Sequence, residues 1–315
     1  MQRWGKTVAG HIRWRCPRCS ISSIVSRPDV TKQARYLLFV SWITGTKTVH
    51  DIASHYAVSR WTITTWFRPF WSIVPHPLPP PNTIDVLIID GLYLESRDHC
   101  VLIGKTPTTV IRWLFAQRES YGSWVLFFSQ IPAPRIVVCD GQKGMRSALK
   151  TICPQTRVQR CVFHVHVLAM ARITKHPRTI VGQQLRHIVG RLFAVHTRRQ
   201  KRRWIRTYRQ WRRTSNQFLK ERTQIQMPGR KRSWWYTHRN LRSVRSLIDN
   251  ALPELFVYIG HAEIPRTTNH VEGGINSHLS ELIHRHRGIL EEKKEILIGH
   301  ILAEKQRRKP TRNLT

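Results

Sequence analysis

Acidic residues are scarce in this chain. Its 315 residues include 18 Asp and Glu against 53 Lys and Arg, which gives a formal net charge of +35. A surface this basic exceeds what solubility requires and repels itself unless polyanions lie close by. The composition therefore predicts a nucleic-acid partner, and it makes the position of each carboxylate informative.

Long apolar runs are absent as well. No stretch approaches the roughly 20 apolar residues of a membrane helix, and Met1-Gln2-Arg3-Trp4 does not open a secretory signal. We therefore expect no membrane partner and a cytosolic or nucleoid location. Disorder is disfavoured, because 41% hydrophobic residues and 12 tryptophans supply enough apolar mass for a core.

Cysteine is sparse and unevenly placed, so the six cysteines do not suggest a disulfide framework. Cys16 and Cys19 have the spacing of half a zinc ribbon, but tetrahedral zinc needs four ligands and no second Cys-x-x-Cys exists. His11 is a conceivable further ligand, although its basic surroundings favour a surface position. Residues 1–28 are therefore interpreted as a partial, zinc-ribbon-like basic segment in which a bound zinc is not favoured.

Two aspartates end two strongly apolar segments. Asp90 follows residues 86–89 and Asp140 follows residues 136–139, and each precedes a glycine. Such runs predict central strands covered on both faces, and aspartates at the ends of neighbouring strands can hold two divalent cations about 4 Å apart. Either Asp-Gly pair alone would be ordinary turn chemistry. Together they predict a phosphoryl-transfer site with two Mg²⁺ or Mn²⁺ ions, which carboxylate oxygens favour.

A glutamate further along the chain completes this carboxylate set. Glu272 follows residues 267–269, any of which can cap a helix, so the acid falls in the first turns of that helix. Asn276 lies one turn later on the same face, where it could orient a ligand or the substrate. Glu263 and Glu281 compete for this role but lack a comparable setting.

Strands and helices alternate from residue 84 onward. We expect strands over 84–94, 99–106, 109–117, 135–140 and 157–164, and helices over 120–131 and 143–152. The first three strands can pair as a meander, and the helix after them supplies a crossover to a parallel strand that carries Asp140. This is the order of a ribonuclease-H-like domain. Asp85 would face the opposite side of its strand from Asp90.

Residues 29–74 predict a small helical domain, which the proline-rich linker 75–83 separates from the rest. Its apolar spacing fits a helix-turn-helix core, with Ser59 as the N-cap of the second helix. Base edges and phosphates would be met at the start of that helix by Arg60, Trp61, Thr62 and Thr64. The alternative is a generic helical hairpin in which Trp61 and Trp66 are core residues.

The segment 166–262 is strongly basic. Its aromatic residues Trp204, Tyr208 and Trp211 recur every three or four positions, which is typical of the buried stripe of a helix. The arginines around them need phosphates as partners. Those expected to bind DNA are Arg202, Arg203, Arg206, Arg209, Arg212 and Arg213.

Cys161 and His164 form a Cys-x-x-His pair. His166 adds a third zinc ligand in principle, but no complementary pair is apparent. We favour a strand end with Cys161 in the core and His164 hydrogen-bonded near the active site. From there His164 would orient a carboxylate or the scissile phosphate.

Several motifs of this chain belong together: VLIIDG, RIVVCDGQKGMRSAL, RVQRCVFHV and RTTNHVEGGINSHL, with HRG nearby. In combination they resemble Mutator-like bacterial insertion-sequence transposases over roughly residues 84–290. The resemblance implies a DDE catalytic triad of Asp90, Asp140 and Glu272, and Cys161 and His164 match the Cys-x-x-His signature of that family. The missing first Cys-x-x-Cys departs from the pattern and suggests a truncated or late-started reading frame.

The resemblance implies an α/β fold: a ribonuclease-H-like catalytic domain with an all-helical insertion, behind a helix-turn-helix domain. The catalytic domain would comprise residues 84–165 and 263–315, the second part carrying the Glu272 helix and a basic tail, with the insertion at 166–262.

The implied reaction is DNA transposition. A metal-activated water attacks the phosphodiester at the end of the element, and the freed 3′-hydroxyl attacks a second phosphodiester in line. Double-stranded DNA and a homodimer or higher oligomer are the implied partners, in the bacterial cytoplasm at the nucleoid. Arg160, Arg266 and Lys143 would contact phosphates. Two alternatives stay open: a ribonuclease-H-like nuclease or resolvase, which cuts without joining, and a DNA-binding regulator without catalysis.

Overall fold

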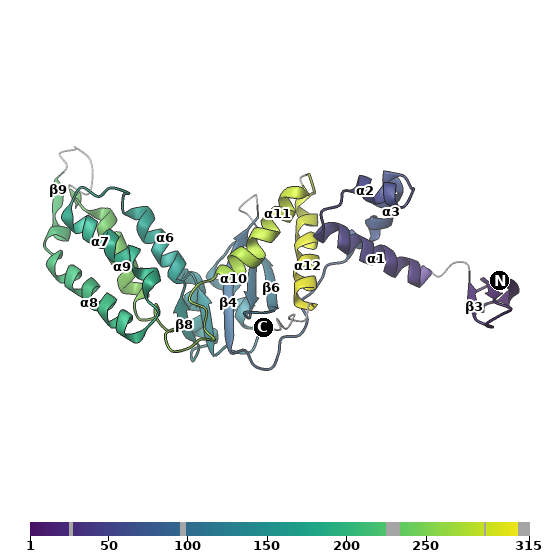
Figure 1. The fold of residues 1–315 in the computed structure, drawn as a ribbon, viewed down its shortest axis with the longest axis horizontal. Coiled ribbons are helices and arrows are strands. Elements are labelled where there is room, and N and C mark those ends of the chain that lie inside the picture. The colour runs from purple at the N-terminus through teal and green to yellow at the C-terminus, as the bar shows by residue number, and fades with distance from the viewer. Residues whose placement is uncertain (25–27, 95–98, 225–233, 287, 308–315) are drawn as a thin grey trace. The chain divides into compact units, whose positions relative to one another are not determined.

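The computed structural model describes residues 1–24, 28–94, 99–224, 234–286 and 288–307, and for residues 28–30, 270, 272 and 291 it describes the backbone alone. The chain is a mixed α/β protein (Figure 1). It divides into two compact units, one formed by residues 1–76 and 282–304 and the other by residues 77–281 and 305–315. Among the described residues, no helix has both the length and the apolar character to cross a membrane.

The first unit contains a small antiparallel sheet and several helices. Their bounds are β1 Gln2–Lys6, β2 Ile12–Arg15, β3 Ser22–Ile24, α1 Pro28–Thr44, α2 Val49–His55, α3 Arg60–Phe67, the 3₁₀ helix η1 Arg68–Ser72 and α12 Glu291–Arg307, which ends in the second unit. The order of the strands is β1-β2-β3. The sequence patterns predicted no strand before residue 28.

Local capping fixes the two short helices. Thr48 and Asp51 form a capping box at the start of α2, and the Ser59 hydroxyl accepts a 3.1 Å hydrogen bond from the Thr62 amide at the start of α3. The predicted cap at Ser59 is therefore confirmed. Trp61 is 75% exposed, so it does not belong to the core.

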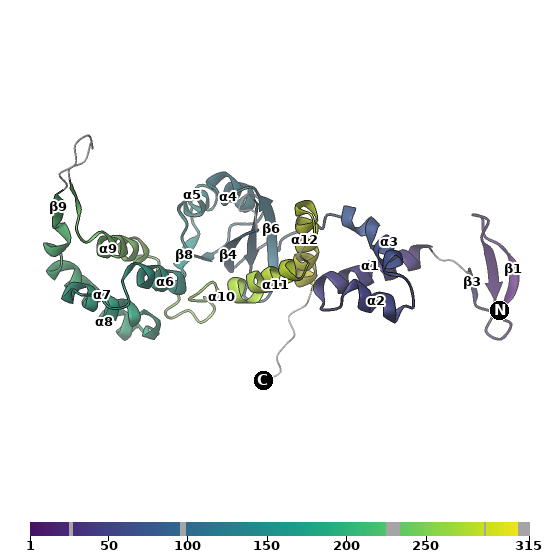
Figure 2. The same ribbon diagram turned by 90° about the horizontal axis from the view of Figure 1, so that it is seen from above.

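The second unit is built on a five-stranded mixed sheet, in the order β6-β5-β4-β7-β8 (Figures 1 and 2). Its first elements are β4 Val86–Tyr93, β5 Cys100–Lys105, β6 Val110–Ala116, α4 Tyr121–Phe128, β7 Ile136–Cys139, α5 Lys143–Ile152 and β8 Arg157–Arg160. β4, β5 and β6 pair antiparallel, whereas β4, β7 and β8 pair parallel. The predicted meander and the crossover to a parallel strand are thus confirmed.

α4 and α5 cover one face of this sheet, as Figure 2 shows. Leu87, Ile89 and Val137 from the strands are buried there with Phe127 of α4 and other apolar residues of both helices. Gly104 permits this contact, because a Cβ atom at that position would lie 2.7 Å from Cζ of Phe127. The central strands are therefore held rigidly beneath two helices.

A helical segment follows β8. Its elements are α6 Val162–Arg172, α7 Ile180–Gly190, η2 Leu192–Ala194, α8 Arg198–Thr214, η3 Phe218–Lys220, β9 Arg222–Gln224, β10 Trp234–Tyr236 and α9 Arg239–Ala251. After it come α10 Asn269–Val271, the π-helical turn η4 Glu272–Asn276 and α11 Ser277–Arg285. The predicted aromatic core is confirmed, since Trp204, Tyr208 and Trp211 are buried among apolar residues of neighbouring helices.

Two expectations for this region are wrong. The strand expected over 157–164 ends at Arg160, because Cys161 caps α6: its Sγ accepts a hydrogen bond from the His164 amide. The insertion is not all-helical, because β9 and β10 form an antiparallel pair within it. Aromatic residues favour strands, and the Arg222 guanidinium lies 3.9 Å from the ring centroid of Trp234 across this pair.

Candidate active site

Asp90 and Asp140 lie at matching positions on adjacent parallel strands. The register pairs Val86 with Ile136 and Ile88 with Val138, so each aspartate stands two residues beyond the last paired residue of its strand. Because side chains alternate along a strand, both carboxylates project from the same face of the sheet. Leu87 and Ile89 point to the other face, which α4 and α5 cover. The structure therefore brings the two predicted aspartates together.

Asn276 holds the Asp90 carboxylate. Its Nδ2 donates a 2.7 Å hydrogen bond to Oδ2 of Asp90, and α10, just before the π-helical turn, packs against β4. Oδ1 of Asn276 is buried without a hydrogen-bond partner among the described residues. Glu272 begins this π-helical turn one turn before Asn276, but its side chain lies outside the described residues. Its backbone is thus placed near Asp90.

The turn after Asp140 depends on a glycine. Gly141 has a φ of +85°, and a Cβ atom there would overlap the Arg160 guanidinium, 1.9 Å from Cζ. Asp140 Oδ1 accepts a 2.8 Å hydrogen bond from the Gln142 amide, which fixes one of its oxygens. Arg160 is only 6% exposed. It therefore packs against this turn and does not form part of an exposed DNA-facing surface.

Glu119 is a carboxylate near the site that the sequence patterns did not single out. A Cβ atom on Gly91 would lie 2.9 Å from its Cδ, so the carboxylate lies against the backbone next to Asp90. Burial raises its pKa, and the charge of Asp140 raises it further. In the sequence, a glutamate directly before a helix cap is indistinguishable from the acids that commonly precede helices.

Cys161 links the strand that precedes Asp140 to the segment that precedes Glu272. Its amide donates a 2.7 Å hydrogen bond to the Cys139 carbonyl, and its Sγ accepts 3.3 Å hydrogen bonds from both the amide and the hydroxyl of Thr268. His164 Nδ1 lies 3.5 Å from the same hydroxyl. Burial opposes ionisation of the Cys161 thiol, yet hydrogen bonds from His164 and Thr268 hold its pKa below the ordinary value.

Asp85, Glu263 and Arg266 have side-chain partners other than the two aspartates. Asp85 is an exposed residue just before β4 and pairs with Arg135 at 3.1 Å, and Glu263 pairs with the same arginine at 3.4 Å. Arg266 donates to the Phe193 carbonyl at 3.0 Å. Lys143 is exposed at the start of α5, next to the Asp140 turn.

The donor atoms beside Asp90 suit a hard divalent cation. Two carboxylates and the unpartnered amide oxygen of Asn276 offer oxygen ligands, which Mg²⁺ and Mn²⁺ prefer. Within the described residues, no group of three His, Cys, Asp or Glu side chains is arranged to hold a metal ion. A third carboxylate would have to come from Glu272, whose side chain is outside that set.

Cys16 and Cys19 lie in one turn of the small antiparallel sheet. They occupy the turn between β2 and β3, where Cys16 bonds through its backbone to Ser20 and Ile21. The backbone amide of Cys19, followed by that of Arg18, lowers the pKa of the Cys16 thiol. The described part of the chain brings no third His, Cys or acidic ligand to them, whereas tetrahedral zinc needs four.

Comparison with known proteins independently supports a relationship to transposases. Residues 86–227 match the model of the Mutator family of transposases. The transposase for insertion sequence element IS905 of Lactococcus lactis subsp. lactis (strain IL1403) is 27% identical over 118 residues, which cover 33% of this chain and 30% of that relative. The chain thus spans less than a third of that relative's length. Together the two matches support an insertion-sequence transposase family for this chain.

Proposed function

We propose that this chain is a DDE-type transposase that binds insertion-sequence ends and catalyses divalent-metal-dependent cleavage and transfer of DNA strands. The observation that carries this proposal is the register of β4 and β7, which sets Asp90 and Asp140 side by side on one face. Asn276 ties the Glu272 turn to Asp90 at 2.7 Å. The matches to transposases support DNA as the class of substrate.

The sheet supports a ribonuclease-H-like assignment. Three antiparallel strands continue into two parallel ones in the order β6-β5-β4-β7-β8, which is the order expected for such a domain from the sequence. The aspartates then lie where the antiparallel and parallel halves meet, between β4 and β7. A sheet covered by helices gives these side chains a rigid base, which a catalytic constellation requires.

Asp90, Asp140 and Glu272 would hold two Mg²⁺ or Mn²⁺ ions. When bound, such ions activate the attacking oxygen and stabilise the leaving oxygen of an in-line displacement. Asn276 orients Asp90, and the Gln142 amide orients Asp140. A ligand fixed by hydrogen bonds loses less freedom when it binds a cation.

Cys161 has a supporting role in this proposal. Through Thr268 it holds the segment that leads into Glu272, and through Cys139 it is bonded to the strand of Asp140. The Cys-x-x-His pair thereby fixes the backbone that leads into Glu272 relative to the strand of Asp140. His164 contributes through the Thr268 hydroxyl, 3.5 Å from its Nδ1.

The helices of the first unit would recognise the element ends. α2 and α3 are joined by a short turn and α3 begins with the exposed residues Arg60 and Trp61. In a helix-turn-helix, the N-terminal residues of the second helix meet base edges in the major groove. A Trp61 side chain that is 75% exposed is consistent with such a contact surface.

The test is a cleavage and strand-transfer assay with duplex DNA taken from the flanks of the coding region. Asp90→Asn and Asp140→Asn should each lower Mg²⁺-dependent cleavage by about 100-fold or more, with DNA affinity near wild type. Asp85→Asn is the matched control and should cleave normally, because Asp85 is exposed before β4 and pairs with Arg135. Retained cleavage in the first two variants would refute the assignment. Cleavage without joined products would indicate a nuclease.

A further inference from the structure

Six arginines line a surface hollow of about 950 Å³ in the helical segment. They are Arg202, Arg206, Arg209, Arg212, Arg213 and Arg245. Five come from α8 and one comes from α9. Among the described residues that line this hollow there is no lysine, and Asn216 is the uncharged polar residue in its wall.

The hollow lies on the side of α8 that faces away from the core. Trp204, Tyr208 and Trp211 are buried on the opposite side of the helix, and a helix of 3.6 residues per turn places Arg202 and Arg209 outward on a single stripe. Arg203 is separated from this stripe and lines a different hollow, together with His187 and Arg191. The arginines of α8 therefore do not all face this hollow.

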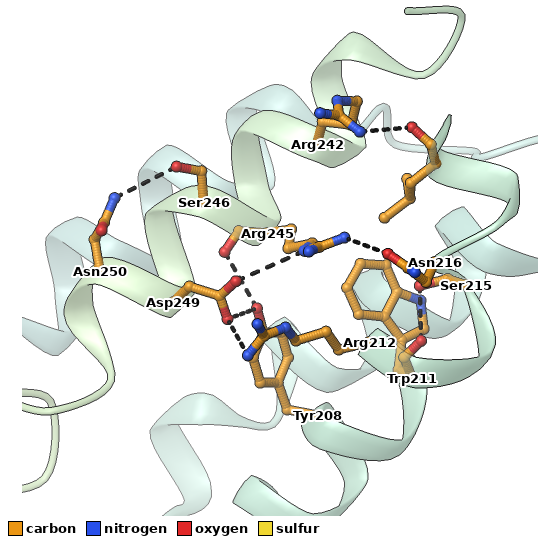
Figure 3. A network of polar contacts seen from close by, with 11 residues as sticks. Tyr208, Trp211, Arg212, Ser215, Asn216, Arg242, Arg245, Ser246, Asp249 and Asn250 are labelled. Carbon is orange, nitrogen blue, oxygen red and sulfur yellow. Dashed lines mark hydrogen bonds and ion pairs between the residues drawn. The ribbon is translucent and has the colours of Figure 1, made fainter. Parts of the chain in front are cut away.

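Positive charge in the hollow is largely uncompensated. Asp249 pairs with Arg212 at 3.4 Å and with Arg245 at 3.6 Å (Figure 3). Within the described residues, no carboxylate lies within 4.0 Å of the remaining four arginines. Guanidinium groups this close together repel one another unless an anion lies among them.

The polar contacts around Asp249 hold two of the arginines in place. The Tyr208 hydroxyl donates a 2.9 Å hydrogen bond to Asp249, and Arg245 donates a 3.2 Å hydrogen bond to Oδ1 of Asn216 (Figure 3). Burial raises the pKa of Tyr208, so this hydroxyl stays a donor throughout the neutral range. Arginines fixed before binding lose less rotamer entropy when a ligand arrives.

We propose that this hollow binds backbone phosphates of duplex DNA. The planar fork of arginine matches phosphate oxygens in a bidentate manner, which lysine does not. The stripe from Arg202 to Arg213 runs about 16 Å along α8, and duplex DNA carries one charge per about 1.7 Å of its axis, so several arginines meet phosphates at once. The inference rests on the proposed transposase function, which supplies DNA as the partner.

The binding mode has a distinct signature. Phosphate contacts carry no direct sequence information, so the hollow would hold any duplex with similar strength. Each arginine that neutralises one phosphate adds about 0.9 to the slope of log K against log salt. This slope separates arginines that touch DNA from arginines that only add to the charge of the chain.

The experiment is a fluorescence-anisotropy titration of the full chain with a 30-base-pair duplex of arbitrary sequence, in EDTA, over a series of salt concentrations. Arg206→Ala/Arg209→Ala removes two charges from the hollow. Arg178→Ala/Arg191→Ala removes two exposed charges that flank α7 and lie outside the hollow. The first variant should lower the salt slope by about 1.8, and the second should leave it within about 0.5 of wild type.

Equal losses in both double variants, or no loss in the first, would overturn the proposal. Tighter binding of a 30-base-pair RNA duplex than of the DNA would overturn it as well. If the wild type fails to bind DNA at all, the transposase function itself fails, whereas normal binding by the Arg206→Ala/Arg209→Ala variant refutes the hollow alone. A thermal melt confirms that each variant is folded.

Discussion

Asn276 donates a 2.7 Å hydrogen bond to Asp90, a residue that precedes it by 186 positions. Replacing this amide by Asn276→Ala leaves Asp90 without that partner, although the sheet still holds its backbone. We expect Mg²⁺-dependent cleavage to fall by about 10- to 100-fold, because partners that orient metal ligands typically have effects of this size. Raising the Mg²⁺ concentration should recover part of the activity, and DNA affinity in EDTA should not change. A cleavage rate and Mg²⁺ dependence equal to wild type would show that the bond has no role.

Glu272 can be tested against its two competitors. Glu272→Gln removes one negative charge at nearly constant volume, so folding and DNA binding should survive while cleavage and strand transfer are lost. Glu263→Gln should be mild, because that side chain pairs with Arg135 at 3.4 Å. Glu281→Gln should also be mild, since Glu281 is an exposed residue of α11. Activity in the Glu272 variant together with its loss in the Glu281 variant would reassign the third carboxylate.

The first turn of α3 should carry preference for the element ends. Arg60→Ala/Thr64→Ala removes side chains from the start of the helix, where base edges would be met, and should reduce the preference for end DNA over random DNA by about tenfold. Arg68→Ala/Thr65→Ala deletes the same residue types at the other end of the helix, where both are exposed. It should leave the ratio unchanged. A competition assay measures both, and equal losses would make α3 a scaffold.

His286 should make the first unit sensitive to acid. Burial lowers the pKa of its imidazole, the neighbouring Arg285 charge lowers it further, and a backbone hydrogen bond at Ile43 only partly opposes this. The unfolded chain then binds a proton near the ordinary pKa of about 6.5 while the folded chain does not. The free energy of unfolding of this unit is therefore undiminished above that pH and falls as the pH drops below it.

His286→Phe keeps an aromatic ring near Trp42, whose ring centroid lies 5.0 Å from that of His286. Thermal melts at pH 7.5 and pH 5.5 should show a smaller drop in melting temperature for this variant than for wild type. His55→Phe, at an exposed residue of α2, controls for the loss of an imidazole. A drop unchanged by His286→Phe would contradict the expectation.

Apolar patterning predicted the strands of the five-stranded sheet well. The runs before Asp90 and Asp140 are too uniformly apolar for anything but buried strands, and both form β4 and β7 at nearly the predicted bounds. Their relative register, which brings the two aspartates together, is a property of backbone pairing. The sequence predicts this register only under the assumption that Asp90 and Asp140 belong to one site.

Other features had no clear signal in the sequence. A single strand was expected over residues 157–164, yet the Cys161 sulfur caps a helix there. Arginines are rarely buried, so nothing indicated that Arg160 would pack against Gly141. Both outcomes depend on long-range contacts: Thr268 bonds to Cys161, and the Arg160 amide bonds to Glu254.

The two ends of the helical segment after β8 are bonded to each other beside the five-stranded sheet. The Val162 amide donates a 3.0 Å hydrogen bond to the Arg266 carbonyl, beside the contact between Cys161 and Thr268. Bringing the two ends of a loop together costs conformational entropy, and this cost rises only with the logarithm of the loop's length. Lengthening a segment whose two ends are already bonded therefore adds little to that cost. A change in the length of the segment between these ends therefore leaves the pairing of β4 with β7, and with it the neighbouring positions of Asp90 and Asp140, in place.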